Sequence, residues 1–233
     1  MSDAGRRNFE RAAATTGAPE DRARVLVERM RAGVVPAEHL AVAAWLGDDN
    51  AALVVPAWAA PRQRTTVPPE LAVWPARHAI GNGPLLSAMC VRVAIEFAER
   101  VLPILAALRP HEGRPQAALE AARAWVACPC ENHRGAAHVA AMAAHAATMD
   151  PGRSAEGGGS VALAAHCAAG AAVAHASARA AVAAGYSAEA AVAQLGLDLA
   201  YQDRARVCLA ARRVEHEWQR LRLIAWLTGD VAA

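Results

Sequence analysis

The chain has 233 residues, of which 55% are hydrophobic, and its formal net charge is +2. This length is enough to bury a sizeable core. The small net charge gives no reason to expect a nucleic acid or an anionic membrane as a partner.

The first residues, Met1 to Glu10, lack the apolar segment of a signal peptide. The five cysteines are an odd number, which fits free thiols better than a disulfide framework. We therefore expect a cytoplasmic protein. Residues 157–178 carry no formal charge, but they are rich in glycine and alanine and contain histidine and serine. A closely packed buried helix is favoured there over a membrane span.

Proline and glycine residues divide the chain into helices, and no stretch alternates long enough between apolar and polar residues to predict a strand. In the first part, these breakers predict helices over about 19–32 and 36–47, followed by a short helix capped within Asp48–Asn50. Residues 1–75 are expected to form an N-terminal helical region.

Residues 76–233 are predicted to form a single helical bundle, which becomes dense in helix formers from Leu85. Pro103 should kink or end its first helix, and Pro110 confirms the stop. The later breakers predict helices over about 114–126, 134–149, 160–185, 187–196 and from Asp198 onward. The fold class is therefore all-α, with about nine or ten helices.

Two features indicate where the core of this bundle lies. The segments 134–149 and 160–185 are rich in alanine, whose small side chain lets helix axes approach closely, so both segments should lie at the centre. Trp125 is expected to anchor the core at the end of the helix that begins at Arg114. Apolar contacts of the last helix are expected from Val207, Val214, Trp218, Leu221 and Trp226.

Cys128, Cys130 and His133 lie within six residues and could contribute to a zinc site, with His138 following in the next helix. The spacing is not that of a zinc finger, because the two cysteines are separated by one residue and no second pair exists. We therefore expect no cofactor and no stoichiometric metal here, with zinc as the alternative. A disulfide between Cys128 and Cys130 would be strained.

His138, Met142, His145 and Met149 fall on one stripe of a helix. His138 and His145 lie about 10.5 Å apart along the axis, too far to share one metal ion. The stripe is expected to be a core seam whose histidines are hydrogen-bonded.

No catalytic residues are predicted. The chain has no Gly-x-Ser-x-Gly motif, no phosphate-binding loop and no cysteine with a defined histidine partner. Arginines give the last helix a basic character, but Asp203, Glu215 and Glu217 interrupt it, which disfavours a nucleic-acid surface.

Three segments carry a resemblance to a known family: Glu99-Arg-Val-Leu-Pro103, then Arg114-Pro115 with Glu120-Ala-Ala-Arg-Ala-Trp125, and Gly170-Ala-Ala-Val-Ala-His175. Over about residues 85–201 the chain resembles immunity proteins of bacterial polymorphic-toxin systems, an Imm-5-like helical domain. The resemblance implies an all-α bundle that neutralises a cognate toxin by binding it, without enzymatic residues. The Cys128–His133 segment and the leading 75 or so residues depart from the family pattern.

Three functions follow as hypotheses: a toxin-binding immunity protein, a metal-binding helical protein, and a regulatory or nucleic-acid-binding protein that uses the last helix. The first is favoured, so we predict a non-enzymatic protein whose partner is a toxin or another protein. Trp and Arg are frequent anchors of protein interfaces, and Trp74 and Arg114 are the predicted partner-binding residues. The sequence does not specify an oligomeric state.

Overall fold

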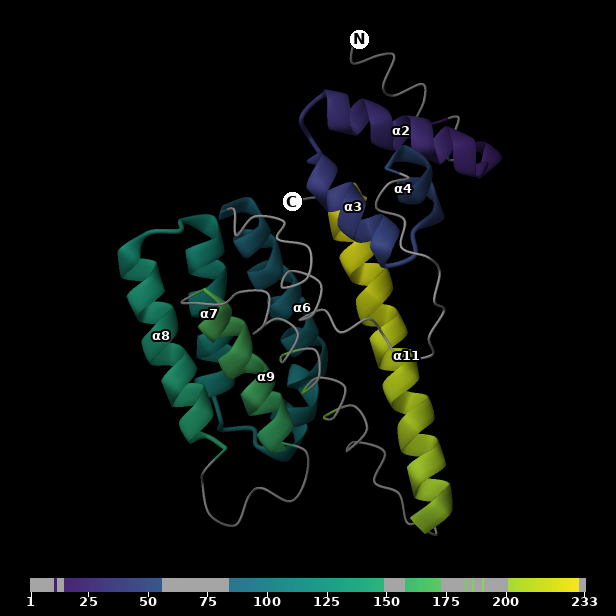
Figure 1. Cartoon of the computed structure of the whole chain (residues 1–233). Coiled ribbons are helices and arrows are strands. Elements are labelled where there is room, and N and C mark those ends of the chain that lie inside the picture. The colour runs from purple at the N-terminus through teal and green to yellow at the C-terminus, as the bar shows by residue number, and fades with distance from the viewer. Residues whose placement is uncertain are drawn as a thin grey trace. The chain divides into compact units, whose positions relative to one another are not determined.

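The structure is a computed structural model that describes residues 11, 15–55, 84–148, 158–172, 183, 186, 190 and 201–230 (Figure 1). These residues contain helices and no strand, which confirms the all-α fold. Eight helices are described, slightly fewer than predicted: α2 (Pro19–Arg31), α3 (Ala37–Trp45), α4 (Asp49–Val54), α6 (Pro84–Leu108), α7 (Arg114–Ala127), α8 (Glu131–Ala146), α9 (Gly158–Ala171) and α11 (Tyr201–Thr228).

The chain divides into two compact units. One unit contains residues 1–67 and 220–233, and the other contains residues 68–219, so α11 contributes to both. The predicted boundary between residues 75 and 76 lies outside the described residues. No helix in the described part of the chain combines the length and the apolar composition needed to cross a membrane.

In the first unit, α2 and α3 each pack against α4. Pro19 opens α2, and Gly33 follows its end with a φ of +70°, the left-handed conformation that glycine adopts most easily. Gly47 follows α3 in the same way with a φ of +92°. The Asp48 carboxylate then caps α4 by accepting a hydrogen bond of 2.7 Å from the backbone N–H of Ala51. The three predicted N-terminal helices are confirmed.

In the second unit, α6, α7, α8 and α9 pack around a core built mainly of alanine (Figure 1). α9 contacts each of the other three helices, and most of its described side chains are buried. Its central position agrees with the prediction. α8 buries only one face, through Ala137, Ala141 and Ala144. Trp125 is buried in the same core, as predicted.

The stripe predicted as a core seam is not one. His138 and Met142 of α8 are exposed, and Met149 lies outside the described residues. His145 packs against His166 of α9, with ring centroids 5.0 Å apart, but its buried Nδ1 has no hydrogen-bond partner among the described residues. The inner face is formed mainly by alanines, which allow α8 to approach α9 closely, whereas His138 and Met142 point outward.

Pro103 does not end α6, which continues to Leu108 and stops before Pro110. An internal proline removes one hydrogen bond of the helix, and the rest of α6 packs against α7 and α9. This packing outweighs the lost bond.

α11 contacts α6 through long side chains. The ring of Trp218 lies 5.9 Å from that of Phe97, and the guanidinium of Arg100 lies 4.1 Å from the same tryptophan ring. The predicted contacts of Val207, Val214 and Leu221 are wrong, because these side chains are exposed. Among the side chains of α11 whose burial the structure describes, the buried apolar ones are instead Leu223, Ile224 and Leu227.

Candidate functional site

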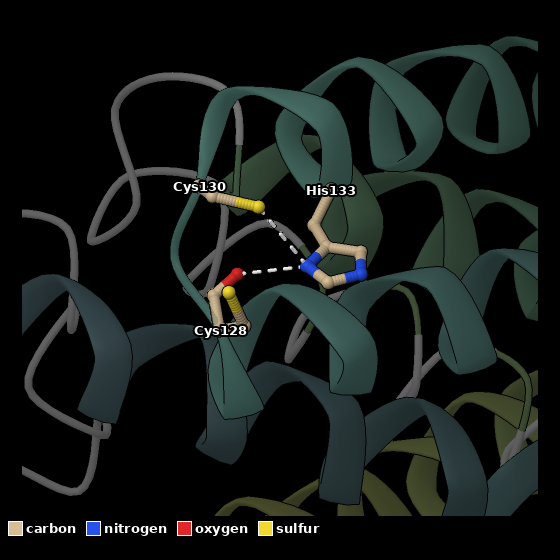
Figure 2. Close-up of side chains that lie close together, drawn as sticks. All are labelled: Cys128, Cys130 and His133. Carbon is tan, nitrogen blue, oxygen red and sulfur yellow. Dashed lines mark hydrogen bonds between the residues drawn. The ribbon is translucent and has the colours of Figure 1, made fainter.

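Three potential ligand residues gather at the corner between α7 and α8 (Figure 2). α7 ends at Ala127, and Cys128 follows in an extended conformation. A residue that precedes proline disfavours the helical conformation, so Pro129 accounts for this stop. Cys130 is the N-cap of α8, which places His133 in the first helical turn.

Two contacts of one imidazole nitrogen connect these residues. The Nδ1 atom of His133 lies 3.3 Å from the Sγ atom of Cys130 and 3.0 Å from the backbone oxygen of Cys128. Figure 2 shows the imidazole turned toward both cysteines. The potential ligand atoms of all three residues lie within 4.8 Å of one another. The one-residue gap between the cysteines therefore does not keep their ligand atoms apart.

The two thiols differ in acidity. The backbone N–H of His133 donates to the Cys130 sulfur and lowers the pKa of that thiol, with a smaller contribution from the Cys128 thiol. The Cys128 pKa is raised, because this thiol donates to Cys130 and faces the charge that develops there. Cys130 is therefore the first to ionise, as expected for a cysteine at a helix N-terminus.

His138, named with this cluster in the zinc alternative, is not part of it. It follows His133 by five residues on α8, which turns it about 140° round the helix axis, and its side chain is exposed. Within the part of the chain that the structure describes, Cys128, Cys130 and His133 form the one group of three or more residues suited to a metal. The sequence indicates these three residues but not the pairing of Cys130 with His133, because it predicts a helix that starts only at about residue 134, with His133 at its beginning.

Arg114, a predicted partner-binding residue, opens α7 at the end opposite to the cysteines. Its guanidinium donates two hydrogen bonds to the Glu112 carboxylate, one of them from Nε at 2.8 Å. These bonds hold the pKa of Glu112 below its usual range, although partial burial opposes the shift. The side chain of Arg114 is 37% exposed, so it is both fixed in place and accessible. Trp74 lies outside the described residues.

The outer face of α8 carries two exposed apolar side chains, Val139 at 69% and Met142 at 50% exposure. The Arg109 guanidinium donates to the carbonyl of Ala147, at 3.3 Å. This bond places the C-terminal end of α8 beside the turn that leads to Arg114. The sequence assigned Met142 to the core, although the alanine spacing of 137, 141 and 144 marks the inner face.

Comparison with known proteins identifies the family. Residues 88–225 match the sequence model of a family described as "Imm-5 like putative immunity protein". The match covers more than half of the chain and includes α7, α8, α9 and most of α6 and α11. No curated protein and no solved structure matched the chain. The match confirms the resemblance carried by the Glu99–Trp125 segment, and the chain belongs to the family of Imm-5 like putative immunity proteins.

Proposed function

We propose that this protein neutralises a cognate bacterial toxin by binding it, without catalytic turnover. The observation that carries the proposal is the family match over residues 88–225. The partner in this proposal is a protein rather than a nucleic acid or a membrane. We place the binding in the cytoplasm, where the five cysteines, all free in the structure, remain reduced.

The proposed binding surface combines Arg114 with the outer face of α8. Arg114 offers a guanidinium that Glu112 holds in position, so little side-chain entropy is lost when a toxin carboxylate binds it. Val139 and Met142 offer exposed apolar area. Arginine together with exposed apolar side chains is a frequent composition of the central residues of protein interfaces. Trp74 is kept as a second proposed anchor.

The stoichiometry of inhibition tests this proposal. The toxin is first captured from the native host with the full chain as bait, and the activity of the purified toxin is then measured with increasing amounts of the chain. Binding without turnover predicts a linear loss of activity that is complete at one chain per toxin. If a small fraction of one equivalent inactivates all the toxin over time, the protein is an enzyme. If a large excess leaves the toxin active, the proposed function is wrong.

Variants then test the proposed surface. Arg114→Ala and Met142→Ala should each weaken toxin binding by about tenfold or more, the threshold of an important interface residue. Arg213→Ala and Leu209→Ala serve as matched controls, because both side chains are exposed on α11. Unchanged affinity in both test variants would exclude the surface but not the inhibitory function.

A further inference from the structure

The spacing in the sequence predicts no metal at Cys128, Cys130 and His133, but their ligand atoms lie close together in the structure. We therefore propose the alternative, that these three residues bind one zinc ion at the corner between α7 and α8. The ligands are two thiolates and one imidazole nitrogen, and a water molecule takes the fourth position. This inference goes beyond toxin binding and does not depend on it. Arg114 and Cys128 flank the two ends of α7, about 20 Å apart along the helix axis.

The distances already approach those of a coordination sphere. Zinc lies about 2.3 Å from thiolate sulfur and about 2.1 Å from imidazole nitrogen, so tetrahedral ligand atoms lie ~3.6–3.8 Å apart. The Sγ atom of Cys130 and the Nδ1 atom of His133 are 3.3 Å apart, and all three ligand atoms lie within 4.8 Å of one another. Side-chain rotations that move the ligand atoms by about 1 Å are therefore enough to admit the ion.

The backbone arranges these ligands before any ion is present. Cys130 is the N-cap of α8 and His133 lies in its first turn, so the helix fixes their separation. Cys128 is held extended before Pro129. Fewer backbone degrees of freedom are lost on binding than in a site assembled from distant loops.

The donor chemistry favours zinc over the common hard cations. Thiolate and imidazole ligands suit Zn²⁺, whereas Mg²⁺ and Ca²⁺ prefer oxygen ligands. Two thiolates neutralise the charge of one Zn²⁺ ion, so no unbalanced charge is left at this corner. The Nδ1 atom of His133 exchanges its contact with the Cys128 carbonyl for the ion, and the ring proton moves to Nε2.

Water is the proposed fourth ligand because the neighbouring carboxylate is turned elsewhere. The Glu131 side chain is 81% exposed and forms an ion pair of 3.0 Å with Arg134. Cys128 is exposed, so the bound ion would be open to solvent on that side, as in other zinc sites with three protein ligands.

Cobalt(II) provides the spectroscopic test. The full chain is freed of metal, kept reduced with a phosphine, and titrated with Co²⁺. We expect a near-ultraviolet thiolate-to-cobalt band and the visible bands of tetrahedral Co²⁺, both saturating at one ion per chain and bleached by Zn²⁺. Absence of saturable bands would overturn the proposal.

Single substitutions assign the ligands. Cys128→Ser, Cys130→Ser and His133→Gln should each weaken binding by more than ~100-fold, because loss of an outer-shell partner alone costs 10–100-fold. Cys208→Ser and His138→Gln are matched controls, which should bind as the unaltered chain does. Circular dichroism establishes that each variant is folded. Full affinity in any of the three ligand variants, or its loss in a control, would overturn the assigned site.

Discussion

Trp125 is the largest side chain in the alanine-rich core between α6, α7, α8 and α9. Small neighbours cannot rearrange to fill the volume of an indole ring, so Trp125→Ala should lower the free energy of unfolding by ~3–5 kcal/mol. Urea denaturation of both proteins measures this difference. Trp125→Phe is the control: the indole N–H has no partner among the described residues, so this variant loses ring volume but no hydrogen bond. A loss below about 1 kcal/mol in Trp125→Ala would contradict the anchoring role.

The carboxyl of Glu112 gives a prediction that depends on pH. Its pKa lies below the ordinary value of 4.5, mainly because Arg114 donates hydrogen bonds to the carboxylate. A lowered pKa in the folded protein adds stability above the ordinary pKa, and this stability is lost as the pH falls through the folded value. Arg114→Ala should therefore raise the Glu112 pKa and make unfolding less sensitive to acid in this range. Carbon-13 NMR of the Glu112 carboxyl measures the pKa, and an equal value in both proteins would contradict this account.

Between elements, an ion pair of Arg100 contributes to the contact of α6 with α11. Its Nε atom donates to the Glu215 carboxylate at 2.9 Å, and the carboxylate side chain is only 5% exposed. Arg100→Ala leaves this buried charge with a weaker hydrogen bond from Gln219, at 3.3 Å. We expect a loss of ~1–3 kcal/mol in the free energy of unfolding, the usual cost of an unsatisfied buried acceptor.

A double-mutant cycle separates this interaction from other effects of the substitution. Glu215→Gln removes the charge of the carboxylate. Arg100→Ala should therefore lower the free energy of unfolding less in the Glu215→Gln protein than in the unaltered chain. Equal costs in the two backgrounds, measured by urea denaturation at pH 7, would show that the two side chains do not stabilise one another.

Local signals are sufficient to predict the helix boundaries of the N-terminal region, whereas side-chain environments depend on neighbouring helices. Gly33, Gly47 and Asp48 predicted boundaries correctly, because the chemistry of a cap is contained within a few residues. The hydrophobic side chain of Met142 predicts burial, and this prediction is wrong, because the close packing of α8 requires alanine on its inner face. Pro103 predicts a kink or an end of the helix, but α6 does not end there, because its tertiary packing outweighs one missing hydrogen bond.

The candidate metal site was predictable as a set of residues but not as a geometry. The cysteines and the histidine stand close together in the sequence, yet their distances depend on where α8 begins. A start at residue 134 would leave His133 outside the helix. The observed start at Glu131 makes Cys130 the N-cap and brings His133 to its sulfur. The observed helix start thus accounts for the contact between Cys130 and His133, which the residue spacing alone does not predict.

At the scale of the whole chain, residues from its two ends meet within one unit. The Arg29 guanidinium, on α2, donates hydrogen bonds of 2.7 Å to the backbone oxygen of Thr228 and to the Asp230 carboxylate. The Arg220 guanidinium donates to the backbone oxygen of Leu46, also at 2.7 Å. The last carbonyl groups of a helix lack hydrogen-bond partners within the helix. A cation near the C-terminal end also interacts favourably with the helix dipole. Arg29 thus supports the end of α11 from a helix nearly 200 residues earlier in the sequence.

Arg29→Ala should therefore loosen the last turn of α11. Hydrogen bonds to charged groups contribute about 1.5–3 kcal/mol, so amide hydrogens near residues 225–230 should exchange roughly tenfold faster or more. Arg24→Ala is the matched control, because Arg24 also lies on α2 but forms an ion pair within that helix, with Asp21 at 3.1 Å. Amides of α9 provide an internal reference, since α9 belongs to the other unit. If hydrogen exchange at residues 225–230 is the same in both variants, Arg29 does not hold the end of α11. Faster exchange in α9 as well would mean that the substitution destabilises the whole molecule rather than this helix end.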